Sequence, residues 1–330
     1  MTAPLRIVFH GENARNFMDG FASLLPDGMA SSIDGLSAAL DQPDERVAFA
    51  AADVVVGIRL DEKSPLPERV RLFHAPSAGT DTIDVTRLPA GCTLCNAYGH
   101  EAPIAEYVFA SLLARHVPLA KADADLRKGE WTFYAGRPNA LRTELGRETI
   151  GLLGFGHIGK AIAARAKAFG MRVVVANRST VERSELVDES YTLDRLEAFM
   201  GAADHIVVSL PLAPETAGIV DAKALAAMRP TATIVNVGRG PVIAEEALYR
   251  ALAEKHIAGA VIDTWYTYPS AAKSVTQPSR FDFASLPNVI MSPHMSGWTD
   301  GLVRRRQETI ADNVRRLASG EPLVNVVHRT

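Results

Sequence analysis

The sequence predicts an α/β protein built on parallel sheets, and three observations indicate this class. Short apolar, β-branched runs alternate with stretches of helical periodicity along nearly the whole chain. One of these runs leads directly into the glycine-rich turn GFGHIG at residues 154–159. Polar residues close the runs one after another, as expected where parallel strands end at a common edge. With 330 residues the chain is long enough for two domains.

Composition narrows the class of protein further. A hydrophobic content of 47% and a charged content of 22% are ordinary for a soluble globular protein. A net charge of −3 gives no reason to expect nucleic acid or an anionic membrane as a partner. The N-terminal residues show no secretory signal, and no apolar stretch reaches the length of a membrane span. With only two cysteines, a cytoplasmic location is expected.

The two cysteines, Cys92 and Cys95, are predicted to be ordinary buried thiols. They form a C-x2-C pair in an apparent strand, and no second Cys or His pair is placed in sequence to complete a tetrahedral site with them. We therefore expect no metal site.

The chain begins with a small α/β unit. Strands are predicted at residues 5–10, 53–58 and 71–75, separated by helical patches. The third strand runs into a turn of small residues, Ser77, Ala78 and Gly79, whose backbone N–H groups are candidates for binding a carboxylate. Taken alone, this turn is better explained as an ordinary βα loop.

A long helical pattern then opens at Glu101 and is expected to link this unit to the next one. Pro118 lies inside the apolar pattern and is predicted to kink the helix. Residues 131–147 are polar and show no helical or strand period. A connection of this length without secondary structure is uncommon and usually has a function. We interpret them as an interface arm.

The central motif is a strand, a glycine-rich turn, a helix and a second strand at residues 149–176. In this context GxGxxG predicts a dinucleotide site. Gly154 allows a tight turn, Gly156 lets N–H groups approach a pyrophosphate, and Gly159 lets the helix pack close to the sheet. The helix N-terminus adds N–H donors and partial positive charge for the phosphates. The candidate cofactor-binding residues of the turn are Gly154, Phe155, Gly156, His157, Ile158 and Gly159.

The second strand of this motif ends in Asn177, Arg178 and Ser179, which are further candidate cofactor residues. An acidic residue at this place usually binds a free ribose 2′-hydroxyl. Here the place is neutral, and the Arg178 guanidinium suits a 2′-phosphate. The sequence therefore predicts NADP(H) preference, with NAD(H) possible. The alternative is that Arg178 is only a solvated turn residue.

Further strands are predicted at residues 205–210, 233–237, 258–262 and 288–291, and a final helix and strand follow at 299–317 and 325–328. Arg239 follows the second of these strands and His294 the fourth. Each alone reads as a surface arginine or a satisfied strand-end histidine. At the edge of a nicotinamide-binding sheet, however, a cation and an acid are what reduction of a 2-keto acid requires.

Five motifs together resemble the D-isomer-specific 2-hydroxyacid dehydrogenases, the family of glyoxylate/hydroxypyruvate reductases, phosphoglycerate dehydrogenase and NAD-dependent formate dehydrogenase. The resemblance covers nearly the whole chain. It is carried by GFGHIG at 154–159, SLPLAPET at 209–216, NVGRG at 236–240, Asp263 in AGAVIDTW, and SPHMSG at 292–297.

The resemblance implies an architecture and a partner. We expect two Rossmann-like domains with parallel sheets and helices on both faces. The nucleotide domain, residues 99–295, would be inserted into a split substrate domain of residues 1–98 and 296–330. A homodimer through the nucleotide domain is also implied, with a dimerisation arm around residues 123–147.

The resemblance also implies roles for individual residues. Arg239 would bind the carboxylate and carbonyl of the substrate, His294 would donate or accept the proton, and Ser77, Ala78 and Gly79 would offer N–H groups to the substrate. Asp263 would contact the nicotinamide carboxamide. The other cofactor candidates outside the glycine turn are Leu210, Pro211, Thr216, Val237, Gly238, Arg239, His294, Ser296 and Gly297.

One position departs from the family pattern. Where most members have a glutamate that pairs with the catalytic histidine, this chain has Tyr268. We include Tyr268 among the catalytic candidates. The expected function is NADPH-dependent reduction of glyoxylate, hydroxypyruvate or a related 2-keto acid to the D-2-hydroxy acid. Because the formate-oxidising branch also lacks that glutamate, oxidation of formate or a similar hydride donor is an alternative. A cofactor-sensing protein with little turnover is another.

Overall fold

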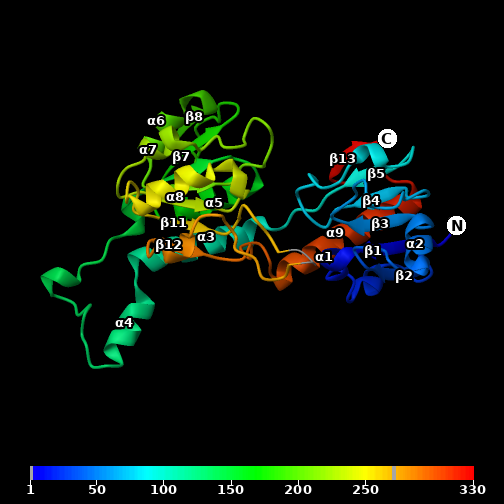
Figure 1. The fold of residues 1–330 in the computed structure, drawn as a ribbon, viewed down its shortest axis with the longest axis horizontal. Coiled ribbons are helices and arrows are strands. Elements are labelled where there is room, and N and C mark those ends of the chain that lie inside the picture. The colour runs from blue at the N-terminus through cyan, green and yellow to red at the C-terminus, as the bar shows by residue number, and fades with distance from the viewer. Residues whose placement is uncertain (1–2, 270–272) are drawn as a thin grey trace. The chain divides into compact units, whose positions relative to one another are not determined.

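The computed structural model describes residues 3–269 and 273–330, and its elements are labelled in Figure 1. The chain divides into two compact units. Unit 1 combines the N-terminal part, up to Gly99, with Thr299–Thr330, and unit 2 is His100–Trp298. Unit 2 is therefore inserted into unit 1 in the sequence.

Unit 1 contains a six-stranded sheet in the order β13-β5-β4-β3-β1-β2. All neighbours are parallel except β13, which pairs antiparallel with β5. Apolar side chains of α1 and α9 pack on one face of the sheet and those of α2 on the other. The strands are β1 (Leu5–His10), β2 (Ala30–Leu36), β3 (Val54–Gly57), β4 (Leu72–His74), β5 (Thr93–Cys95) and β13 (Val326–Arg329), and the helices are α1 (Gly11–Arg15), α2 (Pro43–Ala50) and α9 (Asp300–Ser319).

Unit 2 contains a seven-stranded parallel sheet in the order β12-β11-β10-β9-β6-β7-β8. The strands are β6 (Thr149–Leu153), β7 (Arg172–Asn177), β8 (Glu189–Thr192), β9 (His205–Val208), β10 (Thr233–Asn236), β11 (Gly259–Ile262) and β12 (Val289–Met291). The helices are α3 (Glu101–His116), α4 (Leu119–Leu126), α5 (His157–Ala168), α6 (Leu196–Ala202), α7 (Ala222–Ala226) and α8 (Glu245–Ala253).

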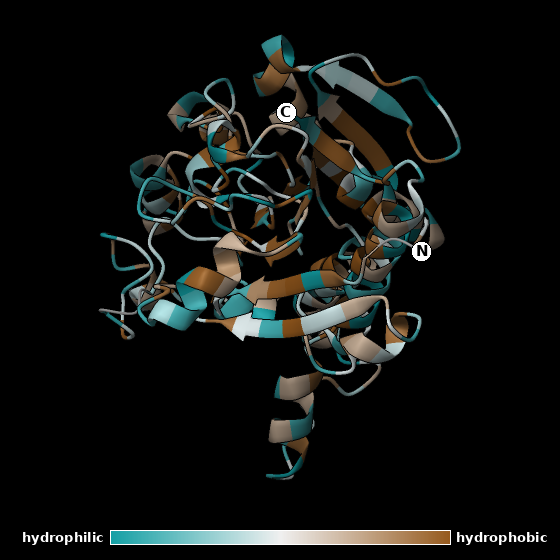
Figure 2. Ribbon diagram, turned by 90° about the vertical axis from the view of Figure 1, so that its right-hand side faces the viewer, coloured by the Kyte–Doolittle hydropathy of each residue, from teal (hydrophilic) through white to brown (hydrophobic). Residues whose placement is uncertain are grey.

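Both faces of the unit 2 sheet are covered by helices. One apolar core lies between the sheet and α3 and α5, and the other between the sheet and α6, α7 and α8. This explains why β6, β7 and β9 read as nearly continuous apolar runs, because a strand buried on both faces has no solvated side. The hydropathy colours in Figure 2 agree, since many strands are brown while the helices carry both brown and teal. The predicted fold class is confirmed.

The structure corrects two details of the sequence interpretation. The strands β2 and β8 were not predicted; both are edge strands with half-buried polar residues, and they lack the apolar run that identified the others. Pro118 does not kink a continuous helix, because α3 ends at His116 and Pro118 is the N-cap of α4. A proline has no N–H for the helical ladder and favours a helix start.

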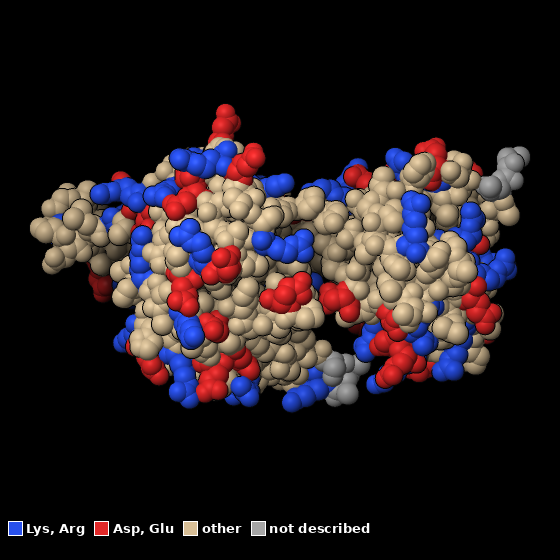
Figure 3. All heavy atoms as spheres, turned by 90° about the horizontal axis from the view of Figure 1, so that it is seen from above, with Lys and Arg blue, Asp and Glu red and all other residues tan. Residues whose placement is uncertain are grey.

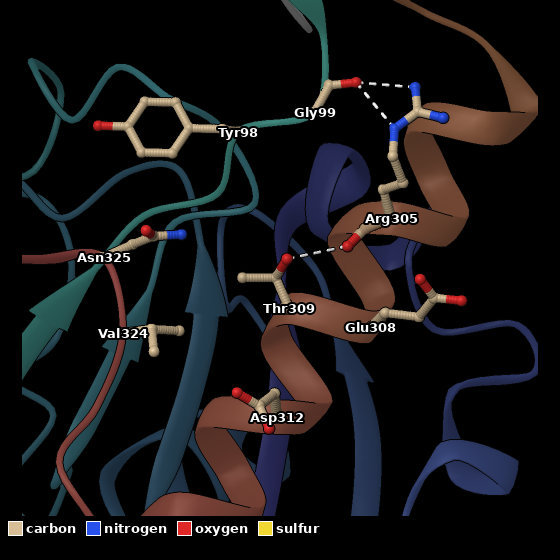
Figure 4. A pocket seen from close by; sticks show the side chains of 8 residues that line it. All are labelled: Tyr98, Gly99, Arg305, Glu308, Thr309, Asp312, Val324 and Asn325. Carbon is tan, nitrogen blue, oxygen red and sulfur yellow. Dashed lines mark hydrogen bonds between the residues drawn. The ribbon is translucent and has the colours of Figure 1, made fainter. Parts of the chain in front are cut away.

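Within unit 1, Gly99, the last residue before the inserted unit 2, is hydrogen-bonded to α9, the helix that follows unit 2 in the sequence (Figure 4). Arg305 of α9 donates from Nε and Nη2 to the carbonyl oxygen of Gly99, at 3.0 and 2.7 Å. Gly99 has a φ of +94°, and a Cβ there would lie 3.2 Å from the Arg305 Nε. A residue without a side chain is therefore favoured at this place. The contact borders a pocket of about 440 Å³ that is also lined by Tyr98, Glu308, Thr309, Asp312, Val324 and Asn325.

Candidate active site

The glycine-rich turn after β6 has the geometry of a phosphate-binding turn. Gly154 has a φ of +99°, and a Cβ there would lie 3.1 Å from the Ser209 Oγ. A Cβ on Gly159 would collide with the carbonyl oxygen of Gly154. Gly156, the N-cap of α5, faces open space, since a Cβ there would meet nothing within 4 Å. The backbone at the start of α5 is thus accessible to a ligand, as anion binding at a helix N-terminus requires.

This turn lies at the point where the strand order of the sheet reverses. The chain runs outward from β6 to β7 and β8 in one direction, and from β9 to β12 in the other. Ligands of open α/β sheets bind in the crevice at such a switch point. Two hydrogen bonds hold the loop after β9: Thr216 Oγ1 donates to the Pro211 carbonyl and accepts from the Ala213 N–H.

The other candidate cofactor residues lie at the same edge of the sheet. Asn177 is the last residue of β7 and is half-buried, while Arg178 and Ser179 after it are exposed. Leu210 and Val237 are buried beyond the ends of β9 and β10. The structure therefore brings the β7 turn, the β9 loop and the glycine-rich turn to one edge of unit 2.

Arg239 lies just beyond the end of β10, between two glycines that the packing requires. A Cβ on Gly238 would lie 2.7 Å from the carbonyl oxygen of Leu210, and a Cβ on Gly240 would collide with the backbone of Trp265. The neighbouring loops therefore approach the chain closely on both sides of Arg239. Its side chain is half-buried, and Nη1 donates to the Gly238 carbonyl at 3.0 Å.

Tyr268 and His294 are in direct contact. The hydroxyl oxygen of Tyr268 lies 3.0 Å from His294 Nδ1. The same oxygen accepts a hydrogen bond from the backbone N–H of Trp265, also at 3.0 Å. Because that N–H can only donate, the Tyr268 proton is available for Nδ1 of the neutral imidazole. When the phenol donates to Nδ1, the hydrogen of the neutral imidazole is on Nε2.

The loop that carries His294 is held by the buried carboxylate of Asp263. Asp263 Oδ1 accepts from the Ser292 hydroxyl at 2.5 Å and from the Met295 N–H at 2.9 Å, and Oδ2 accepts from the Ser296 N–H at 3.0 Å. His294, between these anchors, has a φ of +59°, which is uncommon for a residue other than glycine. Asp263 was predicted to contact nicotinamide; in the structure its carboxylate anchors the histidine loop.

The electrostatic environment links Arg239 to this pair. Desolvation lowers the pKa of His294; the charge of Asp263 opposes this shift, and the charge of Arg239 adds to it. The ring is still partly exposed, so packed protein atoms and solvent both border it. Desolvation raises the pKa of Tyr268, whereas the Trp265 N–H and the Arg239 charge lower it. Tyr268 is therefore a neutral phenol near pH 7, and the Arg239 guanidinium is close enough to act on both groups.

The small-residue turn of residues 77–79 lies in unit 1, after β4. Its carbonyls point inward: Pro76 accepts from Arg306 at 2.8 Å, Ser77 from the Ala97 N–H at 3.1 Å, and Ala78 from Asn96 Nδ2 at 2.8 Å. In a trans peptide the following N–H points away from the carbonyl. The N–H groups of Ser77, Ala78 and Gly79 are thus directed away from these donors, as an anion-binding turn requires.

The two cysteines are buried and do not form a disulfide. Burial raises the pKa of Cys92 to about 11 and that of Cys95 to about 12. Both are therefore protonated, unreactive thiols at neutral pH.

Sequence reasoning missed the residues that support the histidine loop. The hydroxyl of Tyr107 in α3 lies 2.6 Å from the Ser292 Oγ, which in turn donates to Asp263. Tyr107 and Ser292 are 185 residues apart, and no local pattern in the sequence connects them.

Two further features are the distribution of surface charge and the character of the helices. On the face shown in Figure 3, positive and negative side chains are interspersed. Among the residues that the structure describes, no helix combines the length and the apolar character needed to traverse a bilayer.

Comparison with known proteins identifies the family. The model of the D-isomer specific 2-hydroxyacid dehydrogenase, NAD binding domain, matches residues 109–296. The chain is 32% identical to a glyoxylate reductase of Thermococcus gammatolerans over 270 residues, which are 79% of this chain and 77% of that protein.

Solved structures agree with this assignment. A D-isomer specific 2-hydroxyacid dehydrogenase family protein of Aeromonas salmonicida is similar over 99% of both chains, with a TM-score of 0.78 and 27% identity. An NADPH-dependent glyoxylate/hydroxypyruvate reductase of Sinorhizobium meliloti, at 24% identity, shares the fold with a TM-score of 0.76 over 99% of this chain and 97% of that one. With its glycine-rich turn, its Arg239 and its Asp263-anchored histidine loop, the chain belongs to the D-isomer specific 2-hydroxyacid dehydrogenases, a family of nicotinamide-dependent oxidoreductases.

Proposed function

We propose that the protein reduces a small 2-keto acid of the glyoxylate or hydroxypyruvate type to the D-2-hydroxy acid and prefers NADPH. The observation that carries this proposal is the contact between Tyr268 and His294 in a setting where the Arg239 charge acts on both. These groups lie beyond the carboxyl ends of strands in the unit that holds the glycine-rich turn. The similarity to a glyoxylate reductase favours the same substrate class.

A nicotinamide held at the glycine-rich turn would supply the hydride, so the chain's own residues must hold the substrate and provide a proton. The planar fork of Arg239 binds a carboxylate through two parallel hydrogen bonds and polarises the adjacent carbonyl. Protonated His294 donates from Nε2 to the developing alkoxide.

Tyr268 determines which nitrogen of His294 donates the proton to the substrate. In the neutral ring the phenol donates to Nδ1, so Nε2 carries the hydrogen. In the protonated ring Nδ1–H points back to the phenol oxygen, which then accepts from Nδ1 as well as from Trp265. Tyr268 therefore orients the ring in both states but adds no negative charge.

NADPH preference rests on the exposed Arg178 at the end of β7. A guanidinium forms a charge-assisted fork with a phosphate, and neutral Asn177 beside it does not repel one. NAD(H) fits the same turn without that contact, so we expect it to be the weaker cofactor.

The test is a panel of acceptors and donors. We expect the absorbance of NADPH to fall when glyoxylate or hydroxypyruvate is added. We expect no reduction of NADP+ with formate. His294→Gln should abolish the reaction but preserve NADPH binding. His256→Gln, at a side chain that is 62% exposed, is the matched control and should behave as the unmodified protein.

Two outcomes of this panel would replace the proposal. Reduction of NADP+ by formate, with no keto-acid reduction, would assign the alternative hydride-donor activity, which a neutral Tyr268 makes chemically consistent because formate oxidation needs no proton transfer. Tight NADPH binding with no turnover of any compound would instead indicate a cofactor sensor.

The proposed partner is a second copy of the chain, bound through the arm. The segment from α4 to the start of β6 exposes several large apolar side chains: Leu119 is 72% exposed, Trp131 55%, Tyr134 55% and Leu141 87%. Beside it, residues of α3 and α4 line an apolar groove of about 660 Å³. Exposed apolar surface of this kind indicates an interaction site. We expect light scattering to show a dimer, and Trp131→Glu to shift it toward monomer; a monomeric unmodified protein would contradict this.

A further inference from the structure

Three side chains from distant parts of the chain converge at the amino-terminal edge of the unit 2 sheet. His116 ends α3, Glu148 precedes β6, and His205 begins β9. His205 Nε2 lies 2.5 Å from Glu148 Oε2, while His116 Nε2 lies 3.3 Å from the same oxygen and 3.3 Å from His205 Nε2. This group lies at the opposite ends of the strands from Arg239 and His294, so it is separate from the candidate active site.

We propose that His116, Glu148 and His205 form a binding site for a divalent transition-metal ion of the zinc type, which closes the base of the arm. Two imidazole nitrogens and one carboxylate oxygen are a ligand set that Zn²⁺ uses. Nothing in the reduction of a keto acid requires this site, and the inference does not depend on the proposed function.

The distances between the ligand atoms fit such an ion. Ligands about 2.1 Å from Zn²⁺ in a tetrahedral arrangement are separated by about 3.4 Å. Two of the three separations here are 3.3 Å. The third, 2.5 Å between Glu148 and His205, is a hydrogen bond that would lengthen when the ion replaces its proton. A fourth position is left for water or another ligand.

The surroundings of the histidines also suit metal binding. The side chains of His116 and His205 are only 6% and 5% exposed, while Glu148 is 26% exposed and offers a route for the ion. Both histidines direct Nε2 toward Glu148 Oε2, so two ring nitrogens and one carboxylate oxygen face a common point. His116 Nδ1 lies 2.7 Å from the Thr143 Oγ1, an outer contact of the kind that orients a ligating histidine.

The charged residues near the cluster are Arg115, Asp204 and Arg229, and none of them is a proposed ligand. The charge of Arg115 acts on Glu148, and the charge of Asp204 acts on His205. Asp204 is itself paired with Arg229 and accepts from the Thr149 N–H. One cation and one paired carboxylate therefore flank the three ligands.

The position of the cluster gives the ion a structural consequence. His116 lies immediately before residues 117–147, the segment that contains the arm, and Thr143 and Glu148 lie at the far end of that segment. An ion held by His116 and Glu148 thus closes the loop of residues 117–147 at its base. Closing a loop in the native state restricts the ends of the segment, so the arm should resist local opening when the metal is bound.

The experiment measures metal binding directly on the full-length protein after treatment with a chelator. We expect one equivalent of Zn²⁺ to bind by calorimetry, and Co²⁺ to give the visible absorption of a four-coordinate site that Zn²⁺ then bleaches. Zn²⁺ should raise Tm and slow proteolysis within the arm. These readouts are independent of enzymatic activity.

Variants test two of the proposed ligands, His116 and Glu148, and the outer contact Thr143. His116→Ala and Glu148→Gln should each weaken Zn²⁺ binding by at least about 100-fold, and the milder Thr143→Val by about 10-fold to 100-fold, as for an outer contact. Two controls should bind as the unmodified protein: His256→Ala, at an exposed histidine, and the double change Cys92→Ser/Cys95→Ser, which removes the buried thiols.

Several results would overturn the proposal. If the unmodified protein binds less than one equivalent of either metal, the cluster is a proton-only hydrogen-bond network. If Thr143→Val and Glu148→Gln fold and bind Zn²⁺ as tightly as the unmodified protein, the ion is held elsewhere. Loss of binding in the cysteine control alone would assign the ion to the thiols.

Discussion

The hydroxyl oxygen of Tyr268 lies 3.0 Å from Nδ1 of His294 and accepts the backbone N–H of Trp265 at the same distance. The phenol thus contacts Nδ1 of the imidazole, while the proposed proton donor is the other nitrogen, Nε2. A carboxylate there would favour the imidazolium, whereas a neutral phenol lets desolvation dominate. The difference gives this site a pH dependence that can be measured.

The first prediction concerns the pH profile. The pKa of His294 is lowered, first by desolvation and also by Arg239, against the opposing charge of Asp263. Keto-acid reduction uses the protonated ring, whose fraction falls as the pH rises through that pKa. We therefore expect kcat/KM with glyoxylate to decline above a midpoint below about 6.5, the ordinary value for histidine.

Tyr268→Glu tests the cause of this profile. The new carboxylate should raise the pKa of His294 and move the declining limb upward by roughly one unit if it lies within about 4–6 Å. Tyr268→Phe removes the hydroxyl without adding charge, so it should lower kcat/KM without moving the limb upward. A limb above pH 8 in the unmodified protein, unmoved by Tyr268→Glu, would show that another carboxylate supports His294; Glu101 is then the residue to test.

The second prediction concerns the fork of Arg239. Arg239→Lys keeps the charge but loses the two parallel N–H donors, so kcat/KM should fall by about 100-fold or more while the Kd for NADPH stays unchanged. Arg250→Lys, at an exposed residue paired with Glu246, is the matched control. If lysine at position 239 supports full activity, the substrate carboxylate is bound elsewhere. Arg59 of unit 1, which is paired with Asp61, would then be examined.

The third prediction concerns cofactor choice. We expect kcat/KM for NADPH to exceed that for NADH by at least about tenfold, which corresponds to about 1.4 kcal/mol. Arg178→Ala should reduce this ratio. Arg172→Ala, at the amino end of the same strand β7, should leave it unchanged because Arg172 pairs with Glu189. Equal use of the two cofactors by the unmodified protein would refute a role for Arg178 in selecting NADPH.

The fourth prediction concerns Asp263. An amide places a donor where the carboxylate accepts from Ser292, Met295 and Ser296, so Asp263→Asn should distort the His294 loop. We expect a loss of about 1–3 kcal/mol in the free energy of unfolding, with a larger relative loss of kcat than of NADPH binding. Denaturant unfolding and steady-state kinetics measure the two effects.

The control for this prediction is Asp221→Asn. Asp221 caps α7 by accepting from two backbone N–H groups, and asparagine is an equally good cap. Its unfolding free energy and its kinetics should match those of the unmodified protein. An equal loss of stability in both variants would mean that the Asp263 hydrogen bonds have no special role.

The sequence by itself determined the features that depend on near neighbours. The strand, turn and helix around Gly154, Gly156 and Gly159 follow from apolar periodicity and from glycine's backbone freedom, which are local properties. The polar strand ends at Arg239 and His294 were likewise visible, because parallel strands end at one edge. The edge strands β2 and β8 escaped this reasoning, since a half-buried edge needs no apolar run.

Only the tertiary structure decided which side chains meet. Tyr268 and His294 are 26 residues apart, Asp263 and Ser296 are 33 apart, and His116 and His205 are 89 apart. Their contacts depend on strand order, loop path and the packing of helices against a shared sheet, none of which leaves a periodic signal. The family resemblance placed Tyr268 where a residue pairs with the histidine, but the contact between the phenol and the imidazole, and the cluster at the opposite edge, are seen only in the folded chain. Contacts between distant residues are set by burial of the common core, and local residue preferences do not encode them.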